Sequence, residues 1–149
     1  MRSKSVHLSF VLGVVLTLTA LGVAQEGHPL TGTWYGNFGP ASGPKNDLTV
    51  VMTWDGKTTS GVVNPGPNAV PLKTATLDVK LGAPGQRGGP AATPPTFLVH
   101  FEVDARNKAG GTDHFVFDGK IENPVAGNRR IVGAWTCGNT KGDFQLRRY

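Results

Sequence analysis

The side chains that could carry covalent catalysis are few and scattered along this chain of 149 residues. Cys137 is the single cysteine, and the sequence identifies no histidine partner that would activate its thiol. No Gly-x-Ser-x-Gly motif is present either. We therefore expect no catalytic residue and predict that the protein is not an enzyme. Cys137 is expected to pack as a small apolar side chain, and the alternative is a disulfide to Cys137 of a second copy.

Two histidines in the second half of the chain alternate with carboxylates. If the segments that carry them pair as neighbouring antiparallel strands, His100 faces Asp118 and His114 faces Asp104. These pairs would lie on the face opposite the phenylalanines, where complementary cross-strand charges are the ordinary arrangement. Their spacing matches no known pattern of metal ligands, so we predict neither a metal site nor a cofactor.

Large apolar side chains that share the inward phase of their segments are the third set of candidates. Inside a barrel of eight strands they would either fill the core or leave room for one small ligand. A cup would lie at the barrel end that carries Phe38, Val103, Trp135 and Cys137. The inward aromatic and methionine side chains are Trp34, Phe38, Met52, Trp54, Phe97, Phe101, Phe115, Phe117, Trp135 and Phe144. The candidate ligand-binding residues are Phe38, Met52, Phe101, Val103, Phe115, Trp135 and Cys137.

Residues 1–24 have the composition of a secretory signal peptide. Two basic residues precede a mostly apolar run, and Gly22-Val23-Ala24 supplies the small residues that predict cleavage after Ala24. We therefore expect a secreted or periplasmic protein with a single domain over residues 25–149 and no membrane span after cleavage. A permanent membrane helix is the weaker alternative, because the apolar run is short and no basic residues follow it.

The charge and cysteine content narrow the range of partners and of stabilising bonds. Removing Arg2 and Lys4 with the leader leaves 13 basic against 10 acidic side chains, so the formal net charge falls from +5 to +3. That excess is too mild and too evenly spread to indicate nucleic acid. A single cysteine allows no internal disulfide, so stability must come from packing and from closing the sheet.

Glycine and proline punctuate the rest of the chain, and the runs between them are rich in Val, Thr, Phe and Trp. This pattern predicts many short antiparallel strands. Asp55-Gly56 predicts a two-residue hairpin turn that pairs Met52 with Thr59. Eight strands are predicted, at 30–38, 47–54, 57–64, 70–81, 96–104, 112–121, 129–137 and 140–148.

Gly138-Asn139 predicts a second hairpin, with a type II′ turn that pairs Trp135 with Gly142. Strands joined mainly by such short connections favour an all-β fold, an eight-stranded antiparallel up-and-down barrel. The alternative is a two-sheet β-sandwich, which needs longer crossover connections. Only the loop from Gly82 to Pro95 could supply one.

The start of the first strand, Leu30-Thr31-Gly32-Thr33-Trp34-Tyr35, resembles the avidins, and its Gly-x-Trp is similar to the lipocalin motif. In that wider calycin group the tryptophan closes one end of the barrel and is covered by an arginine of the last strand. The resemblance assigns these structural roles to Trp34 and Arg148. The chain as a whole also resembles uncharacterised small exported β-barrel domains of bacteria.

The resemblance to the avidins does not extend to biotin. Gly36 stands where an avidin presents its first-strand asparagine to the ligand. The fifth and sixth strands carry Phe101, Phe115 and Phe117 in place of the tryptophans that stack on biotin. Biotin is therefore not the expected ligand.

Inward positions that are nearly all apolar favour binding over catalysis, because an enzyme needs polar groups that converge inside the barrel. We expect an exported, non-catalytic β-barrel that binds an apolar or amphipathic small molecule. The alternative is an envelope or extracellular interaction module with a solid core, which would bind a protein or a glycan through its loops and strand faces.

Overall fold

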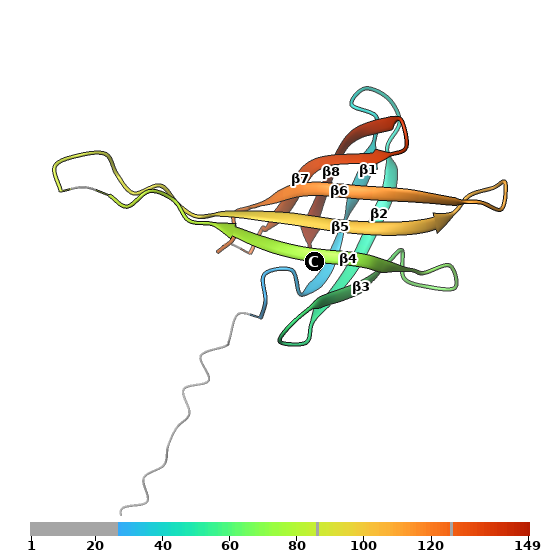
Figure 1. Cartoon of the computed structure of the whole chain (residues 1–149), viewed down its shortest axis with the longest axis horizontal. Coiled ribbons are helices and arrows are strands. Elements are labelled where there is room, and N and C mark those ends of the chain that lie inside the picture. The colour runs from blue at the N-terminus through green and yellow to red at the C-terminus, as the bar shows by residue number, and fades with distance from the viewer. Residues whose placement is uncertain (1–26, 86, 126) are drawn as a thin grey trace, which may run out of the picture.

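The computed structural model describes residues 27–149 except 86 and 126, so the predicted signal peptide lies outside the described residues. The strands are β1 (Gly32–Gly39), β2 (Asn46–Trp54), β3 (Thr59–Val63), β4 (Val70–Lys80), β5 (Thr96–Arg106), β6 (Thr112–Glu122), β7 (Arg130–Cys137) and β8 (Thr140–Arg148). They form a closed antiparallel barrel in up-and-down order, with β1 paired to β8 (Figure 1). The predicted barrel is confirmed and the sandwich alternative is wrong. Within the described part of the chain, no helix has the length and apolar character needed to cross a membrane.

The hairpin of β7 and β8 has the predicted register. Trp135 pairs with Gly142, and Gly133 pairs with Phe144. Gly138 has a φ of 56°, which is the conformation that the first central residue of a type II′ turn requires. The apolar side chains of both strands therefore share the inward face.

The predicted register of β2 and β3 is wrong by two residues, because Met52 pairs with Gly61 rather than with Thr59. The carboxylate of Asp55 accepts hydrogen bonds from the backbone N–H groups of Lys57, at 2.8 Å, and Thr58, at 2.7 Å. These bonds hold a four-residue loop in place of the expected two-residue turn. A shift of two residues leaves each side chain on its predicted face.

The barrel interior is filled by one apolar cluster. Phe101 and Phe117 stack with ring centroids 4.5 Å apart, and Phe144 meets them edge-on at 5.8 and 5.3 Å. Trp54 does not join this cluster, contrary to the inward phase predicted for it. It is the last residue of β2, is 36% exposed and stacks on the ring of His28 at 4.2 Å. The buried apolar residues are Leu30, Trp34, Leu48, Val50, Met52, Val63, Val99, Phe101, Val103, Phe117, Ile121, Ile131, Trp135, Phe144 and Leu146.

The residues just before β1 close one end of the barrel. The N–H of Thr31 donates to the carbonyl of His28 at 2.8 Å, and this turn directs Leu30 into the interior. Leu30 and Trp34 are both 0% exposed, and the indole N–H of Trp34 donates to the carbonyl of Leu30 at 2.7 Å. Arg148 is the cross-strand partner of Trp34. The end of the barrel near Trp34 is therefore packed shut, with its one indole donor satisfied.

The barrel is least well closed between β3 and β4. These strands pair only at Val62 with Pro71 and at Val63 with Val70, so beyond Pro71 the neighbour of β4 is β5 alone. The loop that joins β4 to β5 projects beyond the strands, in yellow-green in Figure 1. The N–H of Thr93 donates to the carbonyl of Ala83 at 3.1 Å, which continues the pairing past the strands.

Neighbouring strands approach closely at several glycines, and this close approach gives a test of the fold. A Cβ added to Gly36 would overlap the carbonyl oxygen of Gln145 on β8, which is backbone and cannot turn aside. We expect Gly36→Ala to lower the free energy of unfolding by about 1–3 kcal/mol, as overpacking does. Urea unfolding followed by tryptophan fluorescence measures this value.

Gly127→Ala is the matched control, because no atom of the described residues lies within 4 Å of a Cβ at that position. It should unfold within about 0.5 kcal/mol of the wild type, as surface substitutions do. Equal stability of the two variants would contradict the close approach of β1 and β8 at Gly36.

Candidate functional site

An apolar pocket of about 140 Å³ opens at the end of the barrel opposite Trp34. It lies beside the turn that joins β3 to β4, where the two strands are barely paired. Its wall is almost entirely carbon, with a single amide side chain at the edge. The lining residues are Phe38, Leu48, Val63, Asn64, Val70, Val103, Ala105, Phe115 and Phe117.

The turn after β3 fixes the polar edge of this pocket. Asn64 has a φ of 48°, a conformation that asparagine tolerates better than most residues. Its N–H donates to the carbonyl of Thr49 at 2.7 Å, and its side-chain oxygen accepts the N–H of Thr49 at 3.0 Å. Asn64 is therefore held in place by β2 at the edge of the pocket.

Aromatic rings form the rigid wall of the pocket on the β1 side. Phe38 meets Phe115 edge-on at 6.0 Å, Phe117 at 5.7 Å and Trp135 at 5.2 Å. The indole N–H of Trp135 donates to the carbonyl of Gly39 at 2.9 Å. The Trp135 side chain is thus packed on its neighbours and hydrogen-bonded. It closes this side of the barrel and does not line the pocket.

The structure divides the predicted ligand-binding residues into two groups. Phe38, Val103 and Phe115 line the pocket. Met52, Phe101 and Trp135 lie in the packed core, and Cys137 packs against it from the end of β7. Only part of the predicted set therefore lines the pocket. The pocket lies closer to β3 and β4 than that set predicted.

Sequence reasoning missed several lining residues. Leu48, Val63 and Phe117 have the inward phase of their strands, but nothing in the phase shows which inward residues border empty space. Asn64 and Val70 flank a turn whose width depends on how far β3 extends. No signal in the sequence gives the short β3, so this part of the pocket could not be anticipated.

Cys137 has the chemistry of an ordinary, unactivated thiol. Burial raises the pKa of Cys137, and the charge of Asp113 raises it further. The thiol is therefore protonated at neutral pH, when it is a poor nucleophile. The disulfide between two copies stays a prediction.

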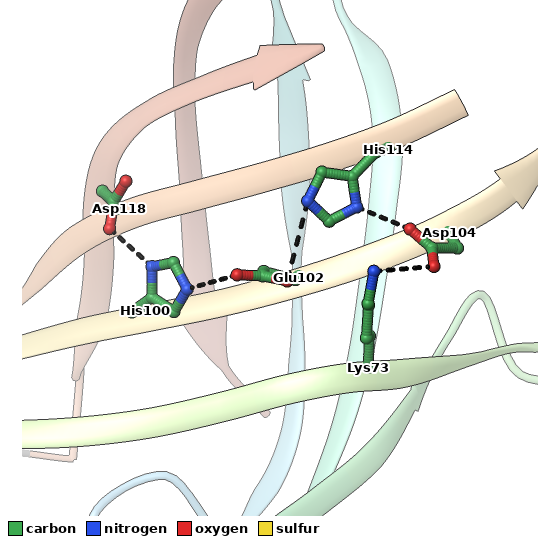
Figure 2. A network of polar contacts seen from close by, with 6 residues as sticks. All are labelled: Lys73, His100, Glu102, Asp104, His114 and Asp118. Carbon is green, nitrogen blue, oxygen red and sulfur yellow. Dashed lines mark hydrogen bonds and ion pairs between the residues drawn. The ribbon is translucent and has the colours of Figure 1, made fainter. Parts of the chain in front are cut away.

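The histidines and carboxylates form a network on the outer face of β4, β5 and β6 (Figure 2). His100 faces Asp118 and His114 faces Asp104, so the predicted cross-strand pairs are confirmed. Nδ1 of His100 lies 2.7 Å from Asp118, and Nδ1 of His114 lies 2.5 Å from Asp104. Glu102 lies between the two rings.

Each ring of this network is bracketed by carboxylates. The second nitrogens of His100 and His114 lie 3.1 and 3.6 Å from Glu102, and Lys73 pairs with Asp104 at 3.1 Å. A ring nitrogen that faces a carboxylate in this way favours a proton over a metal ion. Within the described ranges, no group of three or more His, Cys, Asp or Glu side chains is arranged to hold a metal ion.

The network pairs opposite charges on the surface and shifts the pKa values of two of its members, His100 and Asp104. The hydrogen bond to Asp118 raises the pKa of His100 despite some burial, and Glu102 adds to the effect. The hydrogen bond from His114 lowers the pKa of Asp104, and Lys73 lowers it further. Both shifts favour the charged forms, so the arrangement acts as a set of cross-strand ion pairs.

No family model, curated protein or solved structure matches the chain. The functional assignment therefore depends on the geometry of the chain itself.

The raised pKa of His100 can be measured directly. We expect the NMR titration midpoint of His100 to lie above the ordinary value of about 6.5 in the wild type, and to fall in Asp118→Asn. Because the pKa is raised in the folded state, the bond stabilises the fold below about pH 6.5, and this contribution is lost as the pH rises through the raised pKa. Asp47→Asn, which changes an exposed carboxylate of β2, is the control. An unchanged midpoint in Asp118→Asn would contradict the assignment.

Proposed function

We propose that this protein is a non-catalytic binding protein that holds a small apolar group in the pocket between Phe38 and Val103. The observation that supports it is an open pocket whose wall is carbon on every side except at Asn64. Water in such a space finds too few polar partners, so an apolar ligand gains free energy by replacing it. Catalysis would need polar groups that converge on the pocket. The polar cluster around Glu102 lies instead on the outer face of the barrel.

The volume of the pocket limits the ligand. A dry cavity of roughly 150 Å³ holds one benzene ring, and pockets for larger ligands usually exceed about 300 Å³. At about 140 Å³, this pocket fits one aromatic ring or the end of a short acyl chain. The remainder of an amphipathic ligand would leave through the mouth, where the amide of Asn64 can bind a polar group.

A calycin-type relationship, to the lipocalins and avidins, belongs to the same proposal. The closed eight-stranded barrel and the pairing of Trp34 with Arg148 support it. In that group one end of the barrel is closed and the other receives the ligand, as the opposite positions of Trp34 and the pocket would require. Export by residues 1–24 is also part of the proposal, since an extracellular or periplasmic binding protein would meet free small molecules.

A second candidate function, recognition of a protein or a glycan by a solid barrel, is favoured by two observations. The core below the pocket is filled, with Met52 and Phe101 almost completely buried. The loop between β4 and β5 projects from the barrel and offers a surface outside it (Figure 1). The two candidates differ in whether the pocket accepts an apolar probe.

Benzene is the probe that the pocket size selects. We expect benzene to shift the methyl NMR signals of Val63, Val70 and Val103 in a saturable way, while methyl groups at the Trp34 end stay unchanged. Ala105→Leu adds side-chain volume to the lining and should weaken benzene binding by about tenfold or more, which corresponds to about 1.4 kcal/mol.

Ala134→Leu is the matched control, because Ala134 is an exposed residue of β7 on the outside of the barrel. It should bind benzene like the wild type. If the wild type gives no saturable shift, the pocket proposal fails and the solid-barrel candidate gains. If Ala105→Leu and Ala134→Leu bind benzene equally well, the ligand lies elsewhere.

A further inference from the structure

Arginine side chains gather at the end of the barrel that Trp34 closes. Arg129, Arg130, Arg147 and Arg148 all line one pocket of about 560 Å³, together with Tyr35. This pocket is on the outside of the barrel, where β7 begins and β8 ends. It shares no lining residue with the apolar pocket.

The strand registers force these like charges together. Arg130 is the cross-strand partner of Arg147, and Arg147 is in turn the partner of Tyr35 on β1. The backbone N–H of Arg148 donates to the carbonyl of Arg129 at 3.1 Å, which places the second pair beside the first. Like charges directly opposite each other destabilise a sheet. The opposed pair of Arg130 and Arg147 therefore does not by itself stabilise the sheet.

Among the described residues, Glu122 is the carboxylate that pairs with Arg130. Glu122 accepts a hydrogen bond from Nη2 of Arg130 at 2.6 Å, and it also faces Lys120 at 3.6 Å. No carboxylate is among the residues that line the pocket. Arg147 lines the pocket and is exposed, so its charge and its donor groups are open to a ligand.

We propose that this arginine pocket binds a small molecule that carries a phosphate or sulfate group. Guanidinium groups match the oxygens of such anions in pairs, and the strand register sets Arg130 and Arg147 side by side. Tyr35, which is 46% exposed, offers a flat ring beside Arg147 for the part of the ligand that carries the anion. The volume exceeds that of a bare phosphate, so an ester of a sugar-sized group fits better than the inorganic ion.

The same chemistry is offered by soluble esters and by anionic lipid headgroups, and the experiment separates them. Full-length mature protein is titrated at low ionic strength with inorganic phosphate, with glucose 6-phosphate, and with vesicles of phosphatidylglycerol and phosphatidylcholine. Saturable binding of glucose 6-phosphate in preference to phosphate supports a soluble ester, and vesicle binding without ester binding supports the headgroup. Binding of the ester and binding of the vesicles should both weaken with added salt.

Arg147→Gln is the decisive variant. We expect it to weaken binding by about tenfold or more, and to leave thermal stability equal or higher, because it removes one member of an opposed like-charged pair. Arg147→Lys keeps the charge without the paired donors and should bind with intermediate affinity. Arg106→Gln, which changes an exposed arginine at the opposite end of the barrel, is the control and should bind like the wild type.

Three results would overturn the proposal. The first is a wild type that binds none of the three probes at low ionic strength. The second is an equal loss of binding in Arg147→Gln and Arg106→Gln, which would show only the effect of net charge. The third is an Arg147→Gln variant that is less stable and binds normally, which would assign Arg147 a structural role.

Discussion

Pairing between β1 and β8 is the interaction on which the rest of the structure depends. It joins the two ends of an eight-stranded meander and removes the open edges that a sheet would otherwise expose. With one cysteine, the chain has no internal disulfide to share this task. Gly36 makes the closure tight by letting the backbone of β8 approach. The same pairing sets Arg147 beside Tyr35 and Arg148 beside Trp34, so the closed end and the arginine pocket are products of one register.

Much of the fold could be predicted because its signals are local. Alternation with period two locates the strands, and Gly138-Asn139 fixes one hairpin through the conformation of a single glycine. The predicted register of β2 and β3 was wrong because the true register depends on the Asp55 carboxylate, which accepts hydrogen bonds from two backbone N–H groups. A two-residue shift leaves the alternation unchanged, so the pattern could not reveal the error. Trp54 was wrongly predicted to lie in the core, because the alternation along a strand does not show where the barrel ends.

The candidate sites show a different limit of sequence reasoning. Phase placed Phe38 and Val103 correctly on the inner face, but empty space depends on packing among residues far apart in sequence. The arginines stand as two adjacent pairs near the end of the chain, and the predicted register of β7 and β8 already set one pair opposite the other. What the sequence could not provide was the set of side chains that surrounds them, because that depends on which residues the closed sheet brings near.

One of the two residue pairs that join β3 to β4, Val63 with Val70, also lines the apolar pocket. A wall held by so few hydrogen bonds separates at a lower free-energy cost than any other part of the barrel. The two strands can therefore move apart and enlarge the pocket without disturbing Trp34 or the pairing of β1 with β8. The width of the pocket therefore depends on how far this one junction opens.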